Sequence, residues 1–286
     1  MTAALAPSIA PPLAGGALHA AGSGLFHTLL PIRLVAVGHD GEMVGFVVMA
    51  EGAGFLVGCL GAGRLIRSVG EVRAYAAFAA GSAVLMLALA THPAIPVFMI
   101  IQGVAGFAFA GQSVVIESWL NALVPNVRRG FVLTIYVLVL GLFYGLGQLL
   151  ARDMDPVGDG MLMVSAALFA LALVPVTAIR VPEPQLHAPV GLRLLHAFRV
   201  SPTGTLACLL AGLISATFAS IGPLYDEKLG LGQAGIVLLM AALQLGALFL
   251  QFPIGFVSDL VDRRLALLGL AAAQIAVCVA FLATDA

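Results

Sequence analysis

One acidic side chain lies inside an apolar run, where it could take part in chemistry. Glu51 comes about eight residues after the start of the run 43–66, roughly 12 Å along a helix that rises about 1.5 Å per residue. A carboxylate at the centre of a membrane-spanning helix costs about 2.5–3.5 kcal/mol, so Glu51 must be protonated, be paired or face a water-filled cavity. Two interpretations stay open: a proton-coupling or substrate-binding acid, or a protonated residue hydrogen-bonded between helices.

Polar side chains also recur at helical spacing in the run 9–35. His19, Ser23 and His27 are each four residues apart, so they stay close to one helical face. Two imidazoles on one face could bind a substrate or relay protons. Metal binding is less favoured, because the sequence offers no evident third ligand.

Two further apolar runs carry polar side chains. They are Gln102 and Ser113 in the run 95–120, and Ser215 and Ser220 in the run 204–224. For each of these residues taken alone, an ordinary interhelical hydrogen bond is the competing explanation.

The composition shows which classes of protein are excluded. Of 286 residues, 61% are apolar and only 9% are charged, whereas soluble domains carry about 25% charged residues; the mean hydropathy is +1.10. A soluble enzyme, a disordered chain and a nucleic-acid binder are therefore all disfavoured, and a net charge of −1 leaves no basic patch for phosphates. Signatures of nucleophilic, zinc-dependent and ATP-dependent enzymes are absent, so we expect no catalytic activity, no cofactor and no metal.

The apolar residues fall into runs long enough to cross a bilayer, which takes about 20 helical residues. The runs lack the polar–apolar alternation of β-barrel strands. We therefore predict an all-α integral membrane protein with about nine transmembrane helices, at 9–35, 43–66, 74–91, 95–120, 130–151, 160–180, 204–224, 233–257 and 265–284.

The basic residues predict the orientation of these helices. With the amino terminus in the cytoplasm, ten of the thirteen Lys and Arg residues fall in cytoplasmic connections, as the positive-inside rule requires. The first run lacks the basic region that precedes a cleaved signal peptide, so we expect it to stay as a membrane span. The long, proline-containing break at 181–203 then divides a six-helix bundle, 1–180, from a three-helix bundle, 204–286, as a cytoplasmic loop.

Two connections carry a repeated motif. The segments GRLIRSVGEVR, 63–73, and GFVSDLVDRR, 255–264, resemble Gly-x-Leu-Ala-Asp-Arg-x-Gly-Arg-Arg, the loop signature of the major facilitator superfamily between helices 2 and 3 and between helices 8 and 9. In the first copy Arg67 stands where the pattern has Asp, and in the second Asp262 replaces the second Gly. The basic residue in the first copy and the segments VVIES and QFPIGFVSD resemble the uncharacterised YcaD-type branch of that family.

The resemblance implies a fold and a function. The family has twelve helices in two halves, so this chain resembles a complete first half and three helices of the second, truncated after helix 9. A secondary transporter of the bacterial inner (plasma) membrane would move a small solute by alternating access, with lipid, solute and protons as partners. The alternative is a truncated, non-transporting membrane scaffold or sensor built on the same bundle.

The resemblance also implies which residues act. Helices 1, 4 and 7 line the cavity in the family, so His19, Ser23, His27, Gln102, Ser113, Ser215 and Ser220 become substrate candidates, and Glu51 the proton-coupling candidate. We expect Asp259 to meet the start of the fifth helix near Arg129, and Arg67 to pair with Glu117; solvated side chains are the competing explanation of each. The gating candidates implied by the resemblance are Gly63, Arg67, Gly70, Glu117, Arg129, Gly255, Asp259, Arg263 and Arg264.

Overall fold

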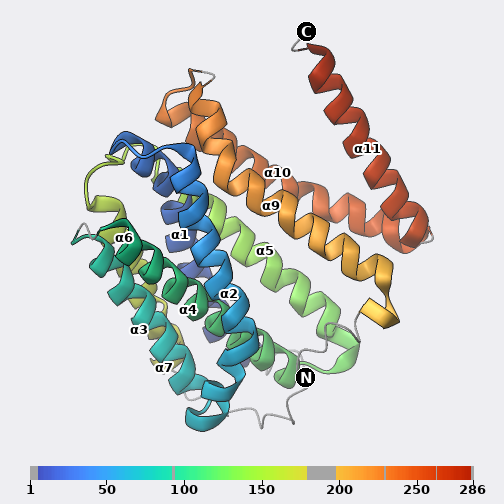
Figure 1. Cartoon of the computed structure of the whole chain (residues 1–286). Helices are drawn as coiled ribbons and strands as arrows, with labels where there is room; N and C mark the ends of the chain where they lie inside the picture. The colour runs from blue at the N-terminus through green and yellow to red at the C-terminus, as the bar shows by residue number, and fades with distance from the viewer. Residues whose placement is uncertain (1–5, 92–93, 179–197, 229, 262, 285–286) are drawn as a thin grey trace. The chain divides into compact units, whose positions relative to one another are not determined.

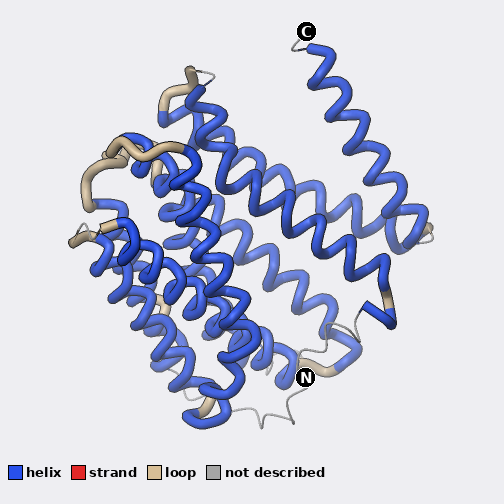
Figure 2. The backbone as a smooth tube through the Cα atoms, viewed as in Figure 1, coloured by secondary structure: helices blue, strands red, loops and turns tan. Residues whose placement is uncertain are grey.

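The computed structural model describes residues 6–91, 94–178, 198–228, 230–261 and 263–284. The regular structure in these ranges is helical, as Figure 2 shows. The helices in chain order (Figure 1) are α1 (Ala6–Ala36), α2 (Gly41–Val69), α3 (Glu71–Leu89), α4 (Ile95–Leu123), α5 (Asn126–Leu150), α6 (Gly160–Leu171), α7 (Leu173–Ala178), α9 (Pro202–Lys228), α10 (Gln233–Leu260) and α11 (Arg263–Thr284).

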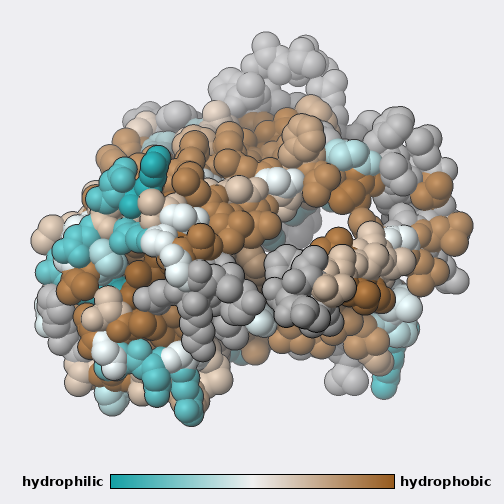
Figure 3. Space-filling model, turned by 90° about the horizontal axis from the view of Figure 1, so that it is seen from above, coloured by the Kyte–Doolittle hydropathy of each residue, from teal (hydrophilic) through white to brown (hydrophobic). Residues whose placement is uncertain are grey.

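Each predicted apolar run coincides with one helix, except that the run 160–180 is divided between α6 and α7. Among the described residues, seven helical stretches are long and apolar enough to cross a membrane, and α11 holds a shorter apolar stretch, Leu268–Ala280. Large apolar side chains lie on the surface, including Phe249, which is 78% exposed, and brown, hydrophobic residues cover much of the face drawn in Figure 3. Such a surface suits lipid rather than water, and the predicted fold class is confirmed.

The connection between α2 and α3 depends on one glycine. Gly70 lies between α2 and α3 and has a φ of +88°. Residues with a Cβ atom rarely adopt this backbone conformation. At its other end α2 is capped by Asp40, whose carboxylate accepts a hydrogen bond of 2.9 Å from the backbone N–H of Met43. Both ends of α2 are therefore fixed by the residues beside them.

The chain divides into two compact units, Met1–Ala242 and Leu243–Ala286. The predicted cytoplasmic loop at 181–203 lies largely outside the described residues, so the predicted division between two helical bundles stays a prediction. Within the first unit the buried apolar side chains form two clusters. We call them the first core, which includes Leu25, Phe98 and Met240, and the second core, which includes Tyr75 and Trp119.

The two cores lie toward opposite ends of the same helices. Helix α4 contributes Phe98, near its start, to the first core and Trp119, near its end, to the second. Helix α1 packs Leu13 against the second core and places Leu25 in the first. Polar side chains of α1 and α4, among them His19 and Gln102, lie between these positions along the chain.

Glycines bring two pairs of helices into close contact in the first unit. A Cβ atom on Gly54 or Gly106 would overlap backbone atoms across the contact between α2 and α4, and one on Gly24 or Gly147 would do the same between α1 and α5. Small residues allow such close approach of membrane helices. The short segment EGAG, in which Gly54 follows Glu51, thus packs against α4.

Candidate functional site

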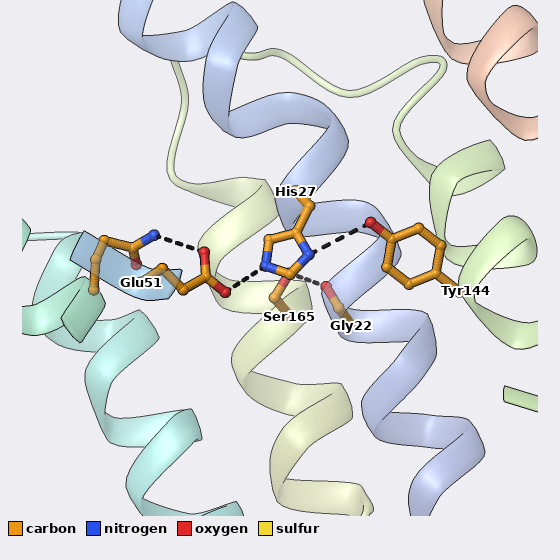
Figure 4. Close-up of polar contacts among 6 residues, drawn as sticks. Gly22, His27, Glu51, Tyr144 and Ser165 are labelled. Atoms are coloured by element: carbon orange, nitrogen blue, oxygen red, sulfur yellow. Dashed lines mark hydrogen bonds and ion pairs between the residues drawn. The ribbon is translucent and has the colours of Figure 1, made fainter. Parts of the chain in front are cut away.

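Side chains from four helices form one hydrogen-bonded chain centred on Glu51 and His27 (Figure 4). The Nε2 atom of His27, on α1, lies 2.8 Å from Oε1 of Glu51, on α2. Gln102, on α4, donates a longer hydrogen bond of 3.5 Å to Oε2 of Glu51, and the hydroxyl of Tyr144, on α5, lies 3.4 Å from Nδ1 of His27. The side chains of His27 and Glu51 are only 25% and 17% exposed. Glu51 is therefore paired, which was one of the three possibilities that its position in an apolar run allowed.

A small cavity lies beside this chain of side chains. Its volume is about 20 Å³ of space open to the centre of a water molecule, enough for one such molecule. The wall combines two imidazoles, a carboxylate and two hydroxyl groups with apolar side chains: His19, Ser23, Phe26, His27, Glu51, Ser82, Met86, Ala105, Phe109 and Phe169. The described residues contain no group of three or more His, Cys, Asp or Glu side chains that could hold a metal ion.

The second imidazole of the cavity, that of His19, is held between two phenyl rings. Its ring centroid lies 5.1 Å from that of Phe109 and 4.4 Å from that of Phe169, with the rings stacked at 19° and 26°. The residue is 5% exposed, and its Nδ1 atom has no hydrogen-bond partner among the described residues. Offset stacking of this kind fixes a ring in position.

The structure brings together some of the predicted cavity residues and leaves others apart. His19, Ser23 and His27 all line the cavity, and Gln102 reaches it through Glu51. Ser113 instead bonds the carbonyl of Phe109 in its own helix at 3.1 Å. Ser215 lies exposed on α9, and the side chain of Ser220 lies outside the described residues.

The predicted gating residues at the end of α2 do not pair as expected. Arg67 and Glu117 are both exposed, and the ion pairs found in the described ranges do not include one between them. The neighbouring Ser118 donates a hydrogen bond of 2.8 Å to Glu71 of α3. The rotation of α4 thus turns Ser118 toward a carboxylate on α3. Of the two alternatives that the sequence left open for Arg67 and Glu117, the exposure of both side chains fits solvated groups rather than a pair.

The remaining gating candidates are placed only in part. Gly63 lies within α2, where a Cβ atom would find just one neighbouring atom, on Arg67, at an ordinary distance of 3.8 Å. Arg129, in the first turns of α5, donates to the carbonyl of Asn121 at 3.0 Å. Gly255 and the side chains of Asp259, Arg263 and Arg264 are not among the parts that the structure describes in detail, so the expected contact of Asp259 with the start of α5 stays a prediction.

Several site residues were not identified from the sequence. Tyr144 lies in the glycine-rich segment GLFYGLG, and that setting was the only signal of its contact with α1. Phe109 and Phe169 gave no signal, because aromatic side chains are common throughout the apolar runs.

Two buried serines near the site were also not identified from the sequence. Ser82, on α3, donates to the carbonyl of Phe78 at 3.0 Å and accepts from Gln112 at 3.1 Å. Ser165, on α6, donates to the carbonyl of Gly22 in α1 at 3.2 Å, as Figure 4 shows.

Hydrogen bonds also tie together the ends of the helices nearest the first core. Arg33 donates to the carbonyl of Gly158 at 2.6 Å and lies 3.2 Å from the carboxylate of Asp159. At the start of α10, the side-chain amide of Gln233 donates to the carbonyls of Ala151 and Met154, at 2.9 and 2.5 Å. The sequence pattern predicts that this end faces the outside.

Comparison with known proteins gives the following similarities. The family model of the Major Facilitator Superfamily matches residues 13–286. An uncharacterized MFS-type transporter, YcaD, of Escherichia coli (strain SE11) is 28% identical over 166 residues, which make up 57% of this chain and 44% of that protein. YcaD of Shigella flexneri matches to the same extent, so the matched region spans less than half the length of these relatives. A crystal structure of a mutant of the nucleoside transporter NupG superposes with a TM-score of 0.69 at 15% identity, over 88% of this chain and 68% of that one.

Proposed function

The chain belongs to the major facilitator superfamily, and from this premise we propose that the protein is a secondary transporter that moves a small solute across the bacterial inner membrane by alternating access. Protons supply the energy in this proposal, and Glu51 binds the coupling proton. The amino terminus lies in the cytoplasm, because that orientation places most arginine residues on the cytoplasmic side.

The observation that carries the proposal is the position of Glu51 between three helices. Its carboxylate contacts His27 of α1 and Gln102 of α4 while the residue itself belongs to α2. Hydrogen bonds to an ionised carboxylate are stronger than those between neutral groups. A proton on Glu51 therefore weakens the contacts that hold α2 to α1 and α4.

This change in contacts is what a coupled mechanism needs. A bound proton shifts a conformational equilibrium only if it binds the two states with different free energies. His27, at 2.8 Å from Glu51, can receive the proton when Glu51 releases it, because imidazoles exchange protons near neutral pH. A conformation that separates α1 from α2 would break that pair and change the free energy of binding the proton.

The test is solute uptake into proteoliposomes that contain the purified protein, with and without an imposed pH gradient. We expect uptake of at least one solute to be accelerated by the gradient in the wild type. In Glu51→Gln, which keeps the size of the side chain but cannot bind or release a proton, the gradient should no longer accelerate uptake. The matched control is Glu42→Gln, an exposed acid in the first turn of the same helix, which should behave as the wild type.

Two outcomes would contradict the proposal. Full acceleration by the gradient in Glu51→Gln would remove Glu51 as the coupling residue. An absence of solute flux under any gradient would favour a membrane scaffold or sensor over a transporter.

A further inference from the structure

Two polar side chains of the cavity differ from the rest in their hydrogen bonds. His27 and Glu51 bond each other, and Ser82 has two partners. His19 and Ser23 are 5% and 4% exposed. The buried Nδ1 atom of His19 has no hydrogen-bond partner among the described residues, and the hydrogen bonds found there do not include the hydroxyl of Ser23. Both nevertheless line the cavity.

Leaving a buried group such as the Nδ1 atom of His19 without a partner is costly. A buried donor or acceptor that makes no hydrogen bond costs about 1–3 kcal/mol, and nearly all such groups in proteins are satisfied. Hydroxyl groups within helices commonly bond the carbonyl four residues earlier, as Thr28, Ser82 and Ser113 do here. Because Ser23 makes no such bond, its hydroxyl is available to a molecule in the cavity.

We propose that His19 and Ser23 form a subsite that takes one uncharged hydrogen-bonding group of the solute, a hydroxyl group, and that the solute is neutral and polar. The proposal rests on the transport function proposed above and adds the chemical class of the solute. A neutral imidazole offers one donor and one acceptor, and a serine hydroxyl offers both. The pair therefore complements a group that also donates and accepts.

The size of the cavity supports a small terminal group. The space of about 20 Å³ open to a water centre holds one water-sized group. A hydroxyl group can take the place of that water and reproduce its hydrogen bonds, which preserves affinity. A carboxylate or phosphate carries two or more terminal oxygens and therefore needs more of this space than a single hydroxyl group does. The stacking of His19 between Phe109 and Phe169 fixes the ring and so limits the room further.

The charges around the cavity also favour a neutral solute. Among the described residues, no Lys or Arg lines the cavity, so no fixed positive charge is present to bind an anion. The carboxylate of Glu51 would repel an anionic group. Arg33, the arginine on the same helix, is engaged with Gly158 and Asp159 beyond the cavity wall.

The test measures solute binding by thermal unfolding of the purified protein in detergent, because a ligand that binds only the folded state raises its unfolding temperature. The probes are neutral sugars, polyols and nucleosides, each paired with its phosphate ester. The variants are Ser23→Ala and His19→Phe, of which the first removes a single atom and guards against misfolding. The matched control is Ser113→Ala, whose hydroxyl already bonds its own helix.

We expect at least one neutral probe to stabilise the wild type and the Ser113→Ala control equally, while its phosphate ester does not. Its affinity should fall about 5- to 150-fold in Ser23→Ala and in His19→Phe, the loss expected when a buried hydrogen-bonding partner is removed. Equal affinity in all four proteins, tighter binding of the esters, or no binding by any neutral probe would overturn the subsite.

The same probes separate this proposal from the transport function. Binding that depends on Ser23 without any gradient-driven uptake would contradict the transport function and support the subsite. Gradient-driven uptake of a neutral solute whose affinity is unchanged in Ser23→Ala and His19→Phe would support the transport function and contradict the subsite.

Discussion

At the scale of single residues, two arginines that neighbour aspartates have very different surroundings. The side chain of Arg33 is 6% exposed and is bound to Asp159 and to the carbonyl of Gly158. That of Arg152 is 52% exposed, and its nitrogen lies 4.0 Å from an aspartate, Asp153, that is 92% exposed. Exposed ion pairs contribute little to stability, whereas buried groups that lose a partner are costly.

We therefore predict that Arg33→Met destabilises the protein by about 1–3 kcal/mol, because Gly158 and Asp159 lose a buried donor. The control, Arg152→Met, should leave stability nearly unchanged. Denaturant unfolding in detergent micelles, followed by circular dichroism, would compare the two variants. Equal stability of both variants would show that the Arg33 contacts do not hold α1 to the start of α6.

The sequence predicted the site only as far as single helices allow. His19, Ser23 and His27 could be assigned to one face because their spacing fixes it, and all three line the cavity. The sequence identified Glu51 from its charge in an apolar run, but it could not predict that Glu51 contacts His27. That contact depends on the rotation of α1 and α2 about their axes, which no spacing within one helix reports. For the same reason the sequence left open whether Arg67 pairs with Glu117 or both side chains are solvated, and both are exposed in the structure.

At the scale of helices, the contact between α2 and α4 sets the position of Glu51. A Cβ atom on Gly54 would overlap the backbone of Gly103, whereas one on Gly52 would meet no atom within 4 Å. Comparing alanine substitutions at these two glycines, which lie two residues apart on α2, therefore separates the effect of helix contact from the effect of helix propensity.

We predict that Gly54→Ala destabilises the protein by about 1–3 kcal/mol, as overpacking at a tight contact does. It should also impair solute uptake, because separating α2 from α4 moves Glu51 away from Gln102. Gly52→Ala should be neutral or slightly stabilising, since alanine favours helix by about 1 kcal/mol over glycine. Thermal unfolding and uptake measured on both variants would test this, and a Gly54→Ala protein as stable as Gly52→Ala would contradict it.

The helices themselves could be predicted far better than their contacts. Run lengths of about 20 apolar residues follow from the thickness of the bilayer, so each run coincided with helix in the structure. The division of the run 160–180 at Ala172 into α6 and α7 was not predicted. It interrupts a run whose apolar composition is continuous, and hydropathy does not report local backbone geometry.

At the scale of the whole chain, the repeated loop motif predicted the family, and the family match over residues 13–286 confirms it. The motif was informative because two copies occurred in corresponding connections, which reflects an internal repeat rather than a single local pattern. Composition and hydropathy alone predicted a membrane protein. They did not distinguish one helical bundle from another, since apolar helices of this length can span a bilayer in any arrangement.

In the proposed alternating-access mechanism the cavity is closed on one side at a time, and we expect Gln233 to contribute to closure at the predicted outer end. Its amide bonds two carbonyls after the end of α5, at Ala151 and Met154, where helix carbonyls lack intrahelical partners. Each hydrogen bond contributes about 1 kcal/mol, so the two together bias the closed state by up to about 30-fold. Gln233→Leu should therefore shift the population toward a state that is open outward.

The shift can be measured with a cysteine in the cavity, Ser23→Cys, in a protein whose Cys59, Cys208 and Cys278 are replaced by alanine. We expect a membrane-impermeant maleimide added outside to label this cysteine about 5- to 30-fold faster in Gln233→Leu, the range expected when one or two net hydrogen bonds are lost. The control, Gln251→Leu, changes an exposed glutamine of the same helix and should not alter the rate. Equal rates in both variants would mean that Gln233 only caps α5. Faster labelling from the opposite side would reverse the orientation that the arginine distribution predicts.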